Sequence, residues 1–244
     1  MSDTSTRHSL AAPVAALIPA YRAAPSVFDV VHATARHVRQ VIVVDDGSKD
    51  DTARRAAEAG ATVLPHARNL GKGAALKSGF AYCRAQGYRL VVTLDADGQH
   101  EPAFIPELLD CQRRTAAPLV IGSRRLAGDM PPLRRFGNRF SSFWLKLVSG
   151  YRHLGDSQSG FRVYDLQAIP PDVLLSPGTG FEYEYQVILA LARRNLPIAT
   201  AEISTVYGRY PDVASNFRAG KDTARIIATY LAHALAKRRG GRKT

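Results

Sequence analysis

Short apolar runs alternate with helical patterns through the first half of the chain. The runs are nearly continuous and rich in β-branched residues, as in strands whose two faces are both covered. They are Val14–Ile18, Val41–Val44, Ala61–Leu64, Leu90–Leu94 and Leu119–Ile121. Between most of them, apolar residues recur at helical spacing. These segments are Ser26–Val38, Asp50–Ala59, Gly73–Gln86 and Pro102–Arg114. The alternation predicts an α/β fold with a mostly parallel sheet and helices on both of its faces.

The second half of the chain has a different pattern. After Gly122 comes a loop rich in Gly, Pro and Arg, and helical patterns then dominate. We find no internal repeat and no low-complexity linker, which favours a single domain with a helical C-terminal elaboration packed on the sheet. The expected organisation is a flexible N-terminus at 1–12, one domain at 13–236 divided near 122/123, and a basic tail at 237–244.

Two helices of the second half are predicted to be amphipathic. The apolar arc of the first, which starts at Pro132, comprises Leu133, Phe136, Phe140, Phe143, Trp144 and Leu147. The arc of the second comprises Ile226, Ile227, Tyr230, Leu231, Ala234 and Leu235, opposite Lys221, Arg225, Thr229 and His233. Two interpretations remain open: either both helices cover the sheet, or they dock on a membrane surface.

The net positive charge of the chain indicates an anionic partner but does not say which kind. The chain has 33 Lys and Arg against 21 Asp and Glu, a net charge of +12. Part of this charge lies in Lys237–Arg239 and in Arg242-Lys243, which are either a solvated tail or a contact for an anionic partner. Nucleic acid, an anionic membrane and a phosphorylated substrate all remain candidates. The composition is that of an ordinary globular protein and excludes a disordered chain.

Cysteine content and hydropathy indicate the compartment. Cys83 and Cys111 are the only cysteines, so a disulfide framework is excluded and a reducing cytosol is expected. No apolar run has the length of a membrane-spanning helix. We interpret Leu10–Ala20 as leading into a buried strand and not as a signal peptide, because prolines interrupt it.

Acidic residues follow two of the predicted strands, at the edge where parallel sheets bind ligands. Asp45 and Asp46 follow the second run, and Asp95 and Asp97 follow the fourth. Residues two apart on an extended chain point the same way, so Asp95 and Asp97 can face one divalent metal ion. Gln99 offers a third oxygen. The alternative is a surface turn. A calcium loop is excluded by the position of Gly98 and by Pro106, which replaces the expected Glu.

A glycine-rich segment, 69–75, lies between these acidic clusters. Its spacing is neither that of a P-loop nor that of a dinucleotide-binding fingerprint, which disfavours a conventional NTPase or dehydrogenase. Either it lets the backbone approach a nucleotide with Lys72 near the phosphates, or it is a plain junction between a loop and a helix.

Six short motifs in order resemble those of the family-two inverting glycosyltransferases, which have the GT-A, Rossmann-like fold. The similarity is greatest to the dolichyl- or polyprenyl-phosphate mannose and glucose synthases, over roughly residues 13–220. The motifs are Pro19-Ala-Tyr21, Val44-Asp45-Asp46-Gly-Ser, Gly71-Lys-Gly73, Leu94-Asp95-Ala-Asp97-Gly-Gln99-His100, Gly122-Ser-Arg124 and Ser159-Gly160-Phe161-Arg162.

The resemblance implies that residues 13–122 bind a nucleotide-sugar and residues 123–236 bind the acceptor. The nucleotide-sugar contacts would be Pro19, Tyr21, Asp45, Asp46, Lys72, Asp95, Ala96 and Asp97. Asp95, Asp97 and Gln99 would hold Mg²⁺ or Mn²⁺. The acceptor phosphate would meet Arg124, Arg134 or Arg135, and Arg209. The sugar pocket would include Asp156, Gln158, Ser159 and Gly160.

The implied reaction is displacement at the anomeric carbon, with Asp95, Asp97 and Asp156 as candidate catalytic residues. A polyprenyl phosphate is already anionic and needs only positioning, which favours a lipid-phosphate acceptor beside the arginine-rich loop. A hydroxyl acceptor of a lipid or saccharide would instead need a carboxylate base, with Asp156 first, then Glu182 or Glu184. A nucleic-acid binder is disfavoured, because acidic pairs at the strand ends would repel a phosphate backbone.

The chain departs from the family at two points. Relatives often have an Asn-Glu pair where this chain has Arg22-Ala23, so UDP and GDP donors both remain open. No transmembrane pair follows the domain, so we expect a cytoplasmic protein whose membrane contact, if any, is peripheral.

Overall fold

The computed structural model describes residues 13–124, 143–151, 154, 156, 158–204, 210 and 219–240, without the side chains of 236–240. The strands are β1 (Val14–Ala20), β2 (Gln40–Asp45), β3 (Thr62–Pro65), β4 (Leu90–Thr93), β5 (Leu119–Arg124), β6 (Arg162–Asp165) and β7 (Ile198–Ile203). The helices are α1 (Val27–Thr34), α2 (Thr52–Glu58), α3 (Lys72–Ala85), α4 (Ile105–Thr115), α6 (Pro171–Leu174), α7 (Glu182–Arg193) and α8 (Ala219–Gly240). A 3₁₀ turn, η1 (Pro102–Phe104), precedes α4, and residues 143–149 are also helical.

The seven strands form one sheet in the order β3-β2-β1-β4-β6-β5-β7. Every neighbouring pair is parallel except those that involve β6, which runs antiparallel to β4 and β5. The predicted α/β class with a mostly parallel sheet is confirmed. The helical second half also supplies two strands that the sequence patterns did not predict, β6 and β7. Charged residues at both ends of β6 obscure its strand pattern in the sequence.

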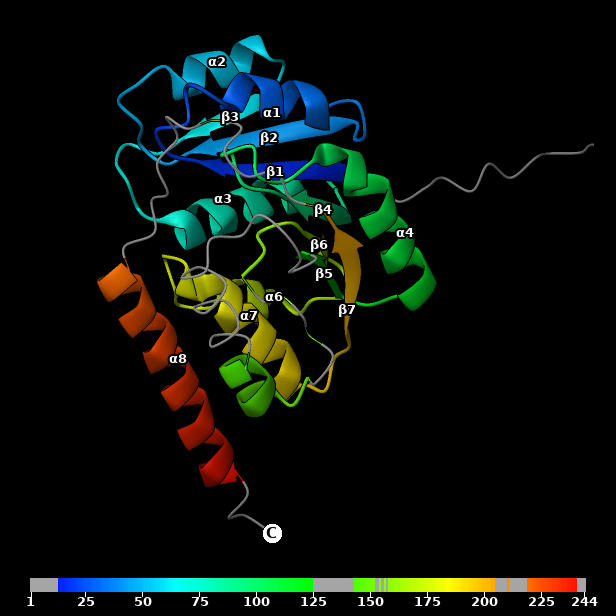
Figure 1. The fold of residues 1–244 in the computed structure, drawn as a ribbon, viewed down its shortest axis with the longest axis vertical. Coiled ribbons are helices and arrows are strands. Elements are labelled where there is room, and N and C mark those ends of the chain that lie inside the picture. Colours follow the sequence, from blue (N-terminus) through cyan, green and yellow to red (C-terminus); the bar gives the residue numbers. More distant parts are fainter. Residues whose placement is uncertain are drawn as a thin grey trace, which may run out of the picture.

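Helices cover both faces of the sheet, as the apolar runs predicted (Figure 1). Alternate residues of β1 belong to two separate cores: Leu17 packs in the core that includes α3 and α7, and Ile18 in the core that includes α1 and α4. The same alternation holds for Ile42 and Val43 of β2. Burial on both faces explains why these strands read as continuous apolar runs.

The C-terminal helix packs against the fold through only part of its predicted apolar arc. Ile226 and Tyr230 are buried, as expected, and His233 is buried as well. Leu231 and Leu235 are instead exposed. On the buried side, Arg193 Nε of α7 donates a hydrogen bond to His233 Nδ1 at 2.9 Å. Most of the helix predicted from Pro132 lies outside the described residues.

The N-terminal half has the predicted strands and helices and differs from prediction only where these elements begin and end. The helix expected at Ser26–Val38 ends at Thr34, and the one expected from Pro102 begins as the 3₁₀ turn η1. Within the described residues, no helix is both long enough and apolar enough to cross a bilayer.

Candidate active site

The strand directions bring distant motifs to one edge of the sheet. The carboxyl ends of β1, β2 and β4 lie at this edge, and antiparallel β6 begins there. The residues before β6 therefore reach the end of β4: Thr93 Oγ1 donates a hydrogen bond to the carbonyl of Gly160 at 2.8 Å. A Cβ on Gly160 would lie 2.6 Å from Asp95 Oδ2. Only glycine allows this approach, which places residue 160 directly against the Asp95 carboxylate.

An ion-pair cluster lies at this point, buried at Arg162 and Glu184 and half-buried at Lys72 and Asp95. Lys72 Nζ lies 2.7 Å from Asp95 Oδ1 and 2.9 Å from Glu184 Oε2. Arg162 Nε lies 3.3 Å from Glu184 Oε1 and donates a hydrogen bond to the Ser159 carbonyl at 2.8 Å. Two cations and two carboxylates thus balance one another where α3, β4, β6 and α7 meet. Buried charges persist in a fold only when they are paired in this way.

The pKa shifts follow from this pairing. Burial by itself raises the pKa of Asp95, but the neighbouring Lys72 ammonium and His100 outweigh it and hold that pKa well below its usual range. Burial lowers the pKa of Lys72, but the charges of Asp95 and Glu184 outweigh this and raise it above its ordinary value. Both groups are therefore charged at neutral pH.

Two glycines make the cluster sterically possible. Gly71 has a φ of +101°, and a Cβ there would lie 2.3 Å from the Thr179 carbonyl oxygen. A Cβ on Gly73 would lie 2.5 Å from Tyr183 Cβ and 2.9 Å from the Gly180 carbonyl oxygen. The glycine spacing thus lets the start of α3 pack directly against the turn before α7. This contact is what carries Lys72 to Glu184.

Replacing Gly73 with alanine is expected to lower the free energy of unfolding by about 1–3 kcal/mol, because the obstructing atoms include backbone that cannot move aside. Thermal or urea unfolding measures this loss. The control is Gly220→Ala in α8, where a Cβ meets nothing within 4 Å. That variant should be neutral or more stable by up to about 1 kcal/mol. Equal stabilities for the two variants would contradict the packing argument.

Asp97 is the carboxylate of this loop that a cation could still neutralise. It is half-buried and accepts a hydrogen bond from the Gln99 N–H at 3.0 Å. Burial raises the pKa of Asp97, and the charge of Asp95 raises it further. Among the described residues, no ion pair is formed by Asp97 and no three His, Cys, Asp or Glu side chains form a ready metal cluster. A half-buried carboxylate that another carboxylate repels fits Mg²⁺ or Mn²⁺.

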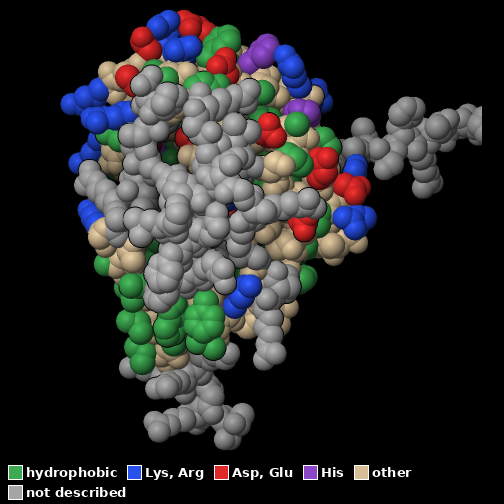
Figure 2. Space-filling view, in the orientation of Figure 1, with side chains coloured by type: hydrophobic (Ala, Val, Ile, Leu, Met, Phe, Trp, Pro, Cys, Tyr) green, Lys and Arg blue, Asp and Glu red, His purple; other side chains and the backbone are tan. Residues whose placement is uncertain are grey.

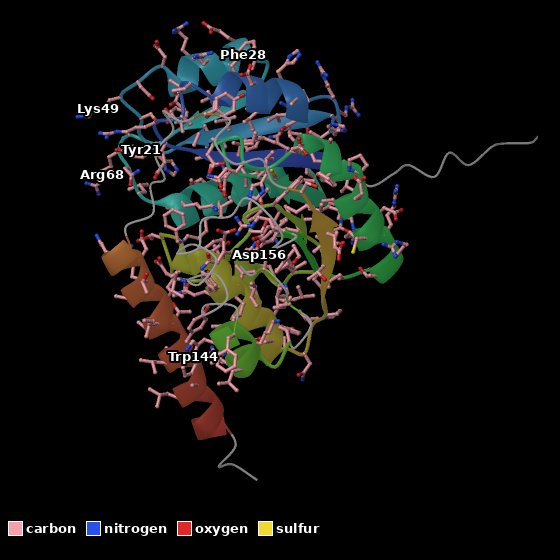
Figure 3. The ribbon with its side chains drawn as sticks, in the orientation of Figure 1. Tyr21, Phe28, Lys49, Arg68, Trp144 and Asp156 are labelled. Carbon is pink, nitrogen blue, oxygen red and sulfur yellow. The ribbon has the colours of Figure 1, made fainter. Side chains whose placement is uncertain are left out.

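The end of the molecule that we expect to bind the nucleotide, here called the nucleotide end, lies at the carboxyl ends of β1 and β2. Pro19 is half-buried at the end of β1, and the Arg22 guanidinium lies 5.2 Å from the centre of the Tyr21 ring. Figure 3 shows Tyr21 near Lys49 and Arg68 at this end of the molecule, and Asp156 nearer its middle. The two basic side chains were not among the predicted site residues.

The carboxylates after β2 have structural partners. Asp46 accepts hydrogen bonds from the N–H groups of Leu70 and Gly71 at 2.9 and 2.7 Å. Its Oδ1 lies 2.7 Å from His66 Nδ1. Asp45 is buried and accepts a hydrogen bond from the Ser48 N–H at 3.2 Å. Asp46 therefore holds the glycine-rich segment in place, and contact of either aspartate with a nucleotide stays a prediction.

Arg124 and Asp156 form a two-pronged ion pair. Arg124 Nε donates to Asp156 Oδ2, and Arg124 Nη2 donates to Oδ1 at 3.1 Å. Asp156 is buried and also accepts a hydrogen bond from the Gln158 N–H at 3.1 Å. Arg124, which we expected to contact the acceptor phosphate, is thus paired with Asp156, the first candidate for a base.

The remaining predicted residues are placed as follows. Ser159 is buried, Gln158 is exposed, and Ala96 is buried with its carbonyl accepting a 2.5 Å hydrogen bond from Ser26 Oγ. Arg134, Arg135 and Arg209 lie outside the described residues. The neighbour of Arg209, Tyr210, reaches the aspartate loop: a Cβ on Gly98 would lie 2.4 Å from the Tyr210 ring.

Sequence reasoning missed how Arg162 and Glu184 act together. Arg162 was noticed only as part of a motif, and Glu184 only as a candidate base. The available signal was an arginine set directly between the apolar residues Phe161 and Val163, which implies a buried carboxylate elsewhere. Nothing in the spacing of the residues identified Glu184 as that carboxylate.

Comparisons with known proteins agree with this architecture. The sequence profile of Glycosyl transferase family 2 matches residues 15–170. The chain is 36% identical over 156 residues to undecaprenyl-phosphate mannosyltransferase of Micrococcus luteus, which covers 59% of this chain and 63% of that protein. It is 31% identical over 218 residues to UDP-N-acetylglucosamine–dolichyl-phosphate N-acetylglucosaminyltransferase of Methanococcus voltae. That match covers 80% of this chain and 86% of that protein.

A solved structure is similar over most of the chain. It is glucosyl-3-phosphoglycerate synthase from Mycobacterium tuberculosis in complex with Mn²⁺, UDP and glucosyl-3-phosphoglycerate. The TM-score is 0.67 at 21% identity, and the match covers 91% of this chain and 80% of the other. At that identity the likeness shows a shared fold.

Proposed function

The chain belongs to glycosyl transferase family 2 and has the GT-A fold, and from this premise we propose that it transfers a hexose from a nucleotide-sugar to a polyprenyl-phosphate lipid. The relatives named above act on undecaprenyl and dolichyl phosphates, which supports this class of acceptor. The donor is a UDP- or GDP-hexose. The reaction takes place at the cytoplasmic face of a membrane, to which the protein binds peripherally.

The state of the candidate bases is the observation that carries the proposal. Asp156 is held by Arg124, and Glu184 by Lys72 and Arg162. Glu182 accepts hydrogen bonds from the N–H groups at 179 and 180, at 3.1 Å each. Each of these carboxylates is engaged by protein cations or N–H groups, whereas the base for a hydroxyl acceptor must be placed to receive the proton of that hydroxyl. A phosphate monoester is already anionic near neutral pH and needs no base, so it is the acceptor that this site suits.

The proposed chemistry is a single displacement. A phosphate oxygen of the acceptor forms a bond to the anomeric carbon as the bond from that carbon to the nucleoside diphosphate breaks. Asp97, with Asp95 and Gln99, would hold Mg²⁺ or Mn²⁺, which when bound neutralises charge on the departing diphosphate. Pro19 and Tyr21 line the base and ribose, with Asp45, Asp46 and Lys72 nearby, and Ser159, Gly160 and Gln158 border the sugar.

Arg124 positions the acceptor phosphate in this proposal, and Asp156 positions Arg124. Arg124→Lys keeps the charge but loses the planar fork, so the acceptor KM is expected to rise about tenfold while the donor KM stays nearly unchanged. Lysine is preferred to alanine because alanine would leave buried Asp156 unpaired. Steady-state kinetics with each substrate varied in turn measures both constants.

The control for this prediction is Arg113→Lys, an equivalent change at an exposed arginine that pairs with Asp110 on α4. It should leave both constants unchanged. An equal rise in the donor and acceptor KM of the Arg124 variant would count against its role at the acceptor.

The direct test of the proposed function is a panel of UDP- and GDP-hexoses with a polyprenyl phosphate and Mg²⁺ or Mn²⁺, scored for a lipid-linked sugar. Product from one donor class identifies the nucleotide. Transfer only to hydroxyl acceptors, with none to the lipid phosphate, would overturn the proposal.

A further inference from the structure

Large apolar side chains stand exposed on two helices of the second half. Phe143 and Leu147 are 61% and 62% exposed, and Leu231 and Leu235 are 60% and 58% exposed. We define the apolar face as Phe143, Trp144, Leu147, Ile227, Leu231 and Leu235. Figure 2 shows hydrophobic side chains gathered over the lower part of α8 and the neighbouring helical segment. Exposed apolar patches of this kind mark interaction surfaces.

The two helices are held in the fold by their other sides. On α8, the Tyr230 ring meets the Tyr185 ring of α7 edge-on at 5.8 Å between centroids, and His233 accepts the hydrogen bond from Arg193. Leu145 of segment 143–149 is buried in the core cluster that also contains Ile226 and Tyr230. Because successive helical residues are 100° apart, residues 227, 231 and 235 form one stripe that points away from this core.

The charges on these helices favour an anionic partner. The sequence of α8 has five basic residues (Lys221, Arg225, Lys237, Arg238 and Arg239) and one acidic residue, Asp222, which is buried. The only charged residue of segment 143–149 is Lys146. An apolar stripe flanked by Lys and Arg, with no exposed carboxylate among these described residues, is the pattern of a helix that lies in the interface of an anionic bilayer.

We propose that the apolar face docks on an anionic phospholipid bilayer. The inference deepens the proposed function and rests on it, since an acceptor anchored in lipid must be met at the membrane. In Figure 3, Tyr21, Asp156 and Trp144 follow one another along the long axis of the molecule. Docking at the Trp144 end places the acceptor half at the bilayer and leaves the expected nucleotide end in water.

The test is flotation of the full chain with vesicles of phosphatidylglycerol and phosphatidylcholine, or of phosphatidylcholine alone. The wild-type chain should bind the anionic vesicles more tightly, and salt should weaken that binding. Leu231→Glu should lower the vesicle partition coefficient about tenfold or more, since it removes a large apolar side chain from the lipid and adds an anion.

The matched control is Ala232→Glu. Ala232 is exposed on the same helix, and helical geometry places it between Lys221 and Arg225, outside the stripe. It adds the same charge, so its partition coefficient should fall much less than that of Leu231→Glu. Equal vesicle binding by wild type and Leu231→Glu would overturn the proposal. So would light scattering that shows a wild-type dimer and a monomeric Leu231→Glu, because a second copy would then cover this face.

Activity assays separate this inference from the proposed function. With a short-chain isoprenyl phosphate in solution, Leu231→Glu should turn over like the wild type. With a long-chain acceptor embedded in anionic vesicles, it should lose activity about tenfold or more, in step with binding. If the wild type glycosylates neither acceptor, the proposed function fails, and the flotation result still decides whether the face binds lipid.

Discussion

Replacing Asp97 with alanine is expected to lower kcat by about a thousandfold or more, because a bound metal ion contributes several kcal/mol to stabilising the leaving diphosphate. The thermal midpoint should stay the same or rise slightly. Burial and the charge of Asp95 both raise the pKa of Asp97, so folding makes its ionised form less favourable than it is in the unfolded chain. Removing it relieves that repulsion and breaks only a hydrogen bond from the Gln99 N–H.

Three measurements check this prediction: kcat, the thermal midpoint, and the added thermal stability that Mn²⁺ confers in the presence of a nucleoside diphosphate. The last should vanish in Asp97→Ala and in excess EDTA. Glu107→Ala removes an exposed carboxylate from α4 and should behave like the wild type in all three. Full activity in EDTA, or a variant at Asp97 that turns over normally, would exclude the metal role.

Replacing Lys72 with methionine is expected to lower the free energy of unfolding by about 3 kcal/mol, because Asp95 and Glu184 would lose the cation that they share. For a chain of this size, that loss corresponds to a fall of about 6–12 °C in Tm. Lys49→Met makes the same substitution at an exposed site and should change the free energy by less than about 0.5 kcal/mol. Denaturant unfolding of the two variants measures the difference.

A double-mutant cycle tests whether the cluster is a unit. Glu184→Gln alone should also lower the free energy of unfolding, because buried Arg162 loses its carboxylate partner while Lys72 keeps Asp95. The combined variant should be more stable than the sum of the two losses by about 1 kcal/mol or more, since the residues are in contact. Additive losses would mean that Lys72 and Glu184 do not interact in solution.

The predictability of the site differed from one part to another. The position of Asp95 and Asp97 after a strand was predictable from the sequence, because a strand end followed by spaced acids is a local pattern. Arg124 and Asp156 were each singled out, yet nothing local indicated that they bind each other across 32 positions. The ion-pair cluster at Lys72 was even harder to predict from the sequence, because it brings together residues 72, 95, 162 and 184 from four separate segments.

The sequence alone determined the parallel half of the sheet, the strand-end position of the acids and the family, because these depend on local periodicity and on ordered motifs. Only the tertiary structure decided that β6 enters the sheet antiparallel and brings Gly160 against Asp95, since strand pairing is a contact between distant segments. It also decided which side of α8 is covered. An amphipathic pattern says that a helix has an apolar side, but the partner that packs against it selects which residues are buried.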